Sequence, residues 1–212
     1  MRKTVFMLLC FLASMQLVRA QDALESIRQR YASIKKYIET HQGNNPYDGA
    51  EWAEFYHLQG QQMLPGTGGH KDDIYMYWDE REEEKIYPSH YLIFATRKYN
   101  YSAISYYEEY LYDENGELAF AYIHNPSWSF DGEGEQKEYE FRFYLKKGRL
   151  IEAIIKSRDN EQQAYKELYK GPKLPTSYVN VFEEYIHQAE KLKRMFTEIE
   201  EVTYDYDEYY KR

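Results

Sequence analysis

Histidines and carboxylates are the residues whose side chains could support chemistry in this chain, so their spacing is considered first. The six histidines are His41, His57, His70, His90, His124 and His187. No two of them have metal-ligand spacing on one helix, and HExxH is absent from the sequence. The nearest approach to a metal cluster, at residues 70–73, lies in a glycine-rich turn where polar residues are common anyway. We therefore expect neither a metal nor another cofactor.

Other catalytic patterns are also missing. The glycines at 66–69 are not followed by the GK[ST] of a phosphate-binding loop, and no GxSxG nucleophile motif occurs. The alternating acids of residues 131–135 lack the remaining ligands of a calcium loop. With 36 acidic residues, carboxylate pairs arise by chance, so they indicate no glycosidase. The sequence gives no positive indication of an enzyme.

The net charge limits the class of partner. The chain has 27 basic and 36 acidic residues, a formal charge of −9. Without its first twenty residues, which carry three basic side chains, the charge is −12. An acidic surface repels phosphate backbones, so we expect no nucleic-acid partner. A basic protein is an allowed partner, although solubility alone explains such a charge.

The first twenty residues read as a secretory signal peptide. Arg2 and Lys3 precede a short apolar run, and Ala20 ends a small-residue cleavage site before Gln21. The run is short for a membrane span, and we expect no integral membrane segment after its removal. Cys10 lies too early in the run for a lipoprotein box. The predicted protein is exported, to the periplasm or the outside, with no cysteine after cleavage.

Hydrophobic periodicity predicts an α+β fold. Apolar residues recur at helical spacing in residues 24–38 and 182–199, and alternate as in strands between them. We expect a curved antiparallel sheet of about six to eight strands in a meander, with an N-terminal and a C-terminal helix covering its apolar face. The predicted domain spans residues 21–203, and residues 204–212 form a polar, aromatic tail.

Two hairpins are predicted from turn residues. Asn115-Gly116 should join a strand at 106–112 to one at 117–124. Lys147-Gly148 should join a strand at 139–146 to one at 150–156. A further strand is expected within residues 163–169.

The 25 tyrosines raise the question of whether they bind a ligand or build the sheet. Tyrosine suits a half-buried pleated surface, where the ring is covered and the hydroxyl stays wet. We expect one sheet face under the helices and the other exposed, with Trp128 in a turn as an aromatic anchor. The candidate ligand-binding residues are Trp128, Tyr106, Tyr110 and Tyr112. The alternative is that these rings only form cross-strand pairs.

Three segments carry a family resemblance. IRQRYASIKKYI, YPSHYLIFATRKYN and YYEEYLYDENGELAFAY resemble small exported proteins of Bacteroidetes-type bacteria. Members of that group have no assigned activity, so the resemblance implies a compartment and not a reaction. It implies no functional residues for this chain.

These observations favour an exported, non-catalytic binding protein. Its partner would be a glycan, a peptide or a basic protein, contacted through a tyrosine-rich sheet face. One alternative is an acidic inhibitor or immunity-type protein that binds a basic enzyme. Another is a carrier that encloses a lipid-like ligand beneath its N-terminal helix. A hydrolase would require carboxylates to converge in a cleft.

Overall fold

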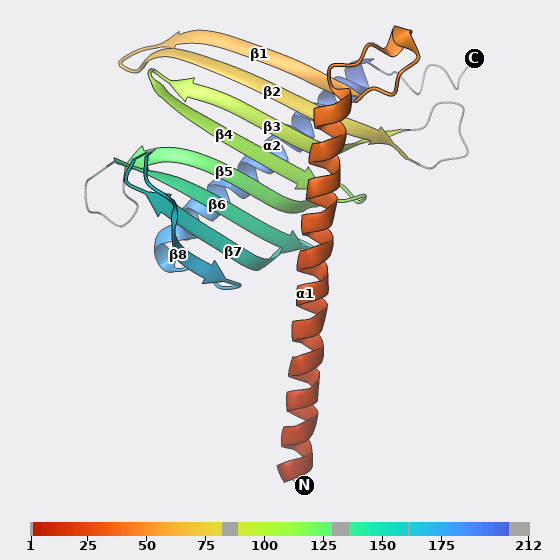
Figure 1. The fold of residues 1–212 in the computed structure, drawn as a ribbon, viewed down its shortest axis with the longest axis vertical. Coiled ribbons are helices and arrows are strands. Elements are labelled where there is room, and N and C mark those ends of the chain that lie inside the picture. The colour runs from red at the N-terminus through yellow and green to blue at the C-terminus, as the bar shows by residue number, and fades with distance from the viewer. Residues whose placement is uncertain (1, 82–88, 129–135, 161, 204–212) are drawn as a thin grey trace.

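The computed structural model describes residues 2–81, 89–128, 136–160 and 162–203. Its centre is one eight-stranded antiparallel sheet with strand order β1 to β8, so each strand pairs with its neighbours in sequence (Figure 1). The elements are α1 (Arg2–His41), the short η1 (Pro46–Asp48), β1 (Phe55–Leu64), β2 (Gly68–Glu80), β3 (His90–Tyr101), β4 (Ile104–Tyr112), β5 (Leu118–Trp128), β6 (Gln136–Lys146), β7 (Arg149–Arg158), β8 (Lys166–Gly171), η2 (Thr176–Tyr178) and α2 (Val179–Thr203). The predicted α+β meander with two terminal helices is confirmed.

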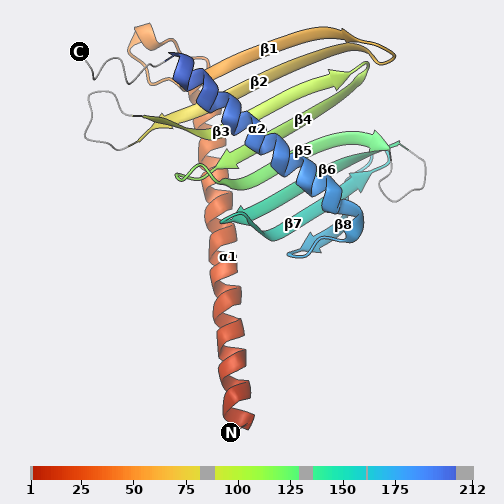
Figure 2. The same ribbon diagram turned by 180° about the vertical axis from the view of Figure 1, so that it is seen from behind.

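The two helices lie on opposite faces of the sheet, which corrects the prediction that both cover one face. Helix α1 crosses one face and α2 runs diagonally across the other (Figures 1 and 2). Each helix has its own core cluster, one containing Ile38 and Phe94 and the other Phe141 and Leu192. Buried residues therefore lie on both faces of the central strands.

Alternation along the strands assigns their residues to the two layers. In β4, Tyr110 packs in the cluster under α2, whereas Leu111 packs in the cluster under α1. Side chains of successive strand residues point to opposite faces, so both sets must find cover. The ambiguous sequence pattern of β4, with tyrosine and glutamate on both faces, reflects this two-sided burial.

Both predicted hairpins form. Lys147 and Gly148 have φ angles of 50° and 68° and form a two-residue turn between β6 and β7. The loop between β4 and β5 is longer, and Asp113 Oδ1 accepts hydrogen bonds from the backbone N–H groups of Asn115 and Glu117. There only Gly116 has a positive φ, 71°, because it ends a turn that starts at Asp113.

Helix α1 is longer than the segment of it that contacts the sheet. Its first half extends past the sheet (Figure 1). On the sheet side, the residues that pack against the core begin at Leu24, with Ala23 also buried. Among the side chains of α1 that the structure describes, those that pack therefore follow the predicted cleavage point. Residues 204–212, predicted to be a polar tail, lie outside the described residues.

Candidate functional site

A recess of about 480 Å³ opens between α2 and the neighbouring ends of β3, β4 and β5. Because residues of α2 contribute to its lining, the recess lies on the face of the sheet that α2 crosses, and Figure 2 shows the path of that helix. This volume is within the range of about 300–1,000 Å³ that is usual for small-molecule sites. Its lining residues are Arg97, Tyr99 and Tyr101 of β3, Tyr106 and Glu108 of β4, Asn125 of β5, and Val181, Glu184, Tyr185 and Gln188 of α2.

Strand register brings the polar lining residues together. Tyr99 lies opposite Tyr106, and Arg97 lies opposite Glu108, in the antiparallel pair of β3 and β4. Alternation then points all four toward the same face of the sheet. Helix α2 crosses this face diagonally, so it leaves one end of these strands uncovered (Figure 2).

Three tyrosines form an aromatic corner in the recess. The rings of Tyr99 and Tyr106 stack with centroids 4.9 Å apart and planes 8° apart. Tyr101 meets Tyr106 edge to face, at 5.8 Å and 72°. On the other side of Tyr99, the Arg97 guanidinium carbon lies 4.2 Å from the ring centroid. The rings are thus held by their neighbours before any ligand arrives.

The charged groups on the sheet floor of the recess, Arg97 and Glu108, already have partners. Arg97 donates to both carboxylate oxygens of Asp72, from Nε at 2.8 Å and from a terminal nitrogen at 2.5 Å. Glu108 is 1% exposed and accepts a 2.8 Å hydrogen bond from the Tyr110 hydroxyl. Burial raises the pKa of the Glu108 carboxyl, although the Arg97 charge and hydrogen bonds from Tyr99 and Tyr110 oppose the shift.

Asn125 connects the sheet to α2 and keeps one polar atom free. Its Nδ2 donates a 2.8 Å hydrogen bond to the Tyr185 hydroxyl. Its Oδ1 is buried and has no hydrogen-bond partner within the described part of the chain. Because an unpaired buried acceptor is unfavourable, this oxygen is a natural contact for a ligand group that donates a hydrogen bond.

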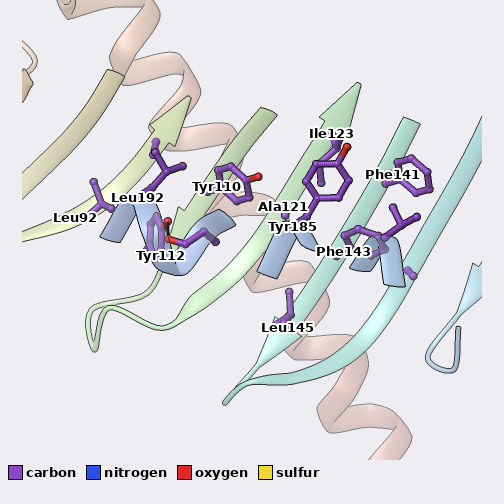
Figure 3. Packing of buried hydrophobic residues seen from close by; sticks show 14 of the residues in the cluster. Leu92, Tyr110, Tyr112, Ala121, Ile123, Phe141, Phe143, Leu145, Tyr185 and Leu192 are labelled. Atoms are coloured by element: carbon purple, nitrogen blue, oxygen red, sulfur yellow. Dashed lines mark hydrogen bonds between the residues drawn. The ribbon is translucent and has the colours of Figure 1, made fainter. Parts of the chain in front are cut away.

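The predicted site residues have different locations. Tyr106 lines the recess. Tyr110 and Tyr112 are 0% and 1% exposed and pack in the core under α2, so their burial does not fit the prediction that they contact a ligand (Figure 3). Trp128 was predicted in a turn, but its backbone pairs with Gln136 at the end of β5, because β5 stays paired with β6 beyond the predicted strand end. The Trp128 side chain lies outside what the structure describes.

Sequence reasoning missed most of the recess. Arg97, Asn125 and Tyr185 come from three elements that are distant in sequence. Tyr185 belongs to the apolar stripe of α2, which indicates core packing and not a site. The one available sign was the segment RKYNY at 97–101, which combines a cation with alternating rings at the end of a strand.

The recess offers stacking surfaces and hydrogen-bonding groups for a ligand. Among the described residues, no group of three or more histidine, cysteine, aspartate or glutamate side chains could hold a metal ion. Within the same residues, no helix is long and apolar enough to cross a membrane. No family model, curated protein or solved structure matches this chain.

Proposed function

We propose that this chain is an exported, non-catalytic binding protein whose ligand occupies the recess between α2 and the ends of β3–β5. The observation that carries the proposal is the aromatic corner of Tyr99, Tyr101 and Tyr106, which opens onto a concave, polar-lined space. A pocket lined by rings, with a few fixed polar groups, is typical of small-ligand sites.

The floor of the recess is held in place without a ligand, which supports a binding role for the recess over a purely structural one. The Arg97–Asp72 pair and the Glu108–Tyr110 hydrogen bond fix the floor of the recess without a ligand. A ligand then meets groups that need little reordering, which reduces the entropy lost on binding. Elsewhere in the sheet, tyrosines such as Tyr110 are covered by α2 and are structural.

A thermal-shift screen tests the location of the site. The chain from Gln21 onward is heated with sugars, amino acids, quaternary amines, nucleosides and fatty acids. A ligand that binds only the folded state raises the melting temperature. We expect Tyr106→Ala to abolish the shift. The matched control is Tyr75→Ala, which removes a partly exposed ring that stacks on His57 elsewhere in the sheet. A shift that survives Tyr106→Ala would contradict the proposal.

Export is part of the same proposal. The charged start, short apolar run and small residues before Gln21 support a cleaved signal peptide. The α1 side chains that the structure places in the core all lie beyond that point, so cleavage would leave these contacts intact. The experiment is to express the full chain in a bacterium and weigh the exported product, whose mass should correspond to residues 21–212. A retained full-length product would argue against export.

A basic protein partner is the second candidate, and a different recess favours it. A hollow of about 680 Å³ near the start of β1 is lined by Glu51, Glu54, Asp79 and Glu80, with Trp52 beside them. Burial and the charges of Glu80 and Asp79 raise the pKa of Glu54, so these carboxylates repel one another. A lysine or arginine of a partner would relieve that repulsion.

Salt dependence tests this second candidate. A lysine-rich peptide should bind the protein at low ionic strength and lose affinity steeply as salt screens the attraction. The double change Asp79→Asn with Glu80→Gln should weaken binding. The control is Glu183→Gln on the exposed side of α2. Equal loss in the control would mean that net charge alone attracts the peptide.

A further inference from the structure

The neutral polar atoms of the recess point to the chemistry of its ligand, an inference that rests on the proposed binding function. Arg97 is paired with Asp72, and Glu108 is nearly fully buried beneath hydroxyl donors. The sheet floor of the recess therefore presents no exposed, unpaired charge to a ligand, and the remaining charged lining residue is the exposed Glu184 of α2. An anionic ligand would have to break the Arg97–Asp72 pair, which is costly for partly buried charges.

Apart from the Glu184 carboxylate on α2, the groups that remain available are neutral donors and acceptors. Neither the hydroxyls of Tyr101 and Tyr106 nor the amide of Gln188 bonds to a side chain within the described residues, and all three line the recess. The Asn125 Oδ1 atom adds a buried acceptor that needs a donor. A ligand hydroxyl is donor and acceptor at once, so several hydroxyls on one ligand can satisfy this mixture.

The rings of Tyr101 and Tyr106 provide the surfaces on which a ligand can stack. Tyr101 and Tyr106 meet at 72°, so they form two walls of a corner rather than one flat plate. A ligand with an apolar C–H face and a polar edge can pack against one wall and turn its hydroxyls toward Asn125 and Gln188. The volume of about 480 Å³ lies toward the lower end of the usual range, so the ligand is short.

We propose that the recess binds a neutral carbohydrate of one or two sugar residues, which stacks on the Tyr101–Tyr106 corner and donates a hydroxyl hydrogen bond to Asn125 Oδ1. Gln188 contributes a second, peripheral hydrogen bond from α2. An ammonium ligand would also pack against aromatic rings. On the sheet floor it finds no carboxylate, because Glu108 already receives hydrogen bonds and is not exposed, so its charge would have to pair with Glu184 of α2.

Saturation-transfer NMR tests the proposal with named probes. The probes are the methyl glycosides of glucose, galactose, mannose and N-acetylglucosamine, together with maltose, cellobiose and lactose, each at 10 mM. Tetramethylammonium and free amino acids serve as charged comparison probes. We expect at least one saccharide to receive saturation through its ring C–H protons, and its affinity to change little with salt, since an uncharged ligand is not screened.

Variants then locate the bound sugar. Tyr106→Ala should weaken binding about tenfold through loss of a ring contact. Gln188→Ala should weaken it about fivefold through loss of one hydrogen bond. Gln188 is partly exposed on α2, so its variant should keep the melting temperature of the parent even if Tyr106→Ala folds poorly. Tyr75→Ala should bind like the parent.

Each alternative result would overturn the carbohydrate inference alone, or that inference together with the proposed binding site. If tetramethylammonium or an amino acid binds with Tyr106 dependence and no saccharide does, the carbohydrate inference fails and the binding site stands. If a saccharide binds equally well to the Tyr106 and Gln188 variants, the recess is not its site and both proposals fail. If no probe of any class binds the recess at 10 mM, both proposals fail as well.

Discussion

Two adjacent glutamates in β4 show how one strand can bury acids on both of its faces. Glu108 and Glu109 are 1% and 2% exposed and, by alternation, lie under α2 and α1 respectively. Each is surrounded by phenolic hydroxyls that donate to it, Tyr110 for Glu108 and Tyr31 and Tyr107 for Glu109. The tyrosines next to these acids are therefore partners for buried carboxylates as well as sheet-building rings.

Glu109 should anchor α1 to the sheet. Lys35 Nζ lies 2.7 Å from its carboxylate, and the hydroxyls of Tyr31 and Tyr107 donate to it as well. Glu109→Ala removes the shared acceptor of all three groups, so we expect it to lower the free energy of unfolding by about 3 kcal/mol. Urea denaturation measures this, with the exposed Glu117→Ala as control. A loss no larger than that of the control would show that α1 is held by apolar contacts alone.

The raised pKa of Glu108 predicts a pH dependence of stability. The folded state holds this proton more tightly than the unfolded state, so the contribution of Glu108 falls as pH rises through the window above the unfolded value of about 4.3. Glu108→Gln cannot titrate. We expect the parent to lose stability relative to this variant between acidic and neutral pH, measured by urea denaturation across that range.

The exposed Glu183→Gln is the matched control for this titration. Its stability curve should run parallel to that of the parent across the same pH range, because its side chain is solvated in both states. A parallel curve for Glu108→Gln as well would mean that the pKa of the Glu108 carboxyl is the same in the folded and unfolded states.

At the scale of elements, α2 is held by a row of apolar side chains and one buried hydroxyl contact. Leu192 is fully buried in the cluster under α2, and the Tyr112 hydroxyl donates a 2.6 Å hydrogen bond to the Ala189 carbonyl (Figure 3). Leu192→Ala should cost about 2–5 kcal/mol by leaving a cavity. Thermal or urea unfolding measures the loss, and exposed Lys191→Ala is the control. A loss below about 1 kcal/mol would contradict tight packing of α2.

Elements were predicted well where local chemistry decides them. Lys147-Gly148 and the loop at Asn115-Gly116 identified their hairpins because positive φ angles and turn hydrogen bonds are local requirements. Helical periodicity identified both helices. The placement of the helices on opposite faces was not predicted. Tyrosine and glutamate occupy both faces of β4, and both residue types are compatible with an exposed or a buried face of a sheet.

The recess could not be predicted from the sequence, for a different reason. Tyr106 was a candidate, but its partners Tyr99 and Asn125 join it only through strand register and the diagonal path of α2. Tyr110 has the same residue type and strand as Tyr106, yet lies in the core. The difference is set by where α2 passes over the sheet, which no local pattern encodes.

At the scale of the whole molecule, the sheet and both helices form a layered body that should not need the first twenty residues. Packing of α1 begins at Ala23 and Leu24. A chain that starts at Gln21 should therefore unfold at the same temperature as the full chain, measured by circular dichroism. A chain that starts at Ser33 loses Ile27 and Tyr31 and should melt lower. Equal melting of both truncated chains would mean that α1 contributes little to stability.

The meander order has a consequence for how the chain folds. Every ladder in the sheet joins strands that are adjacent in sequence, so contact order within the sheet is low and each hairpin can close in about 1–10 μs. Helix α1 differs, because the strands that it packs against include β5, β6 and β7, which follow much later in the chain. We expect α1, which is synthesised before the strands, to be among the last elements to dock, after the hairpins have formed the surface that it packs against.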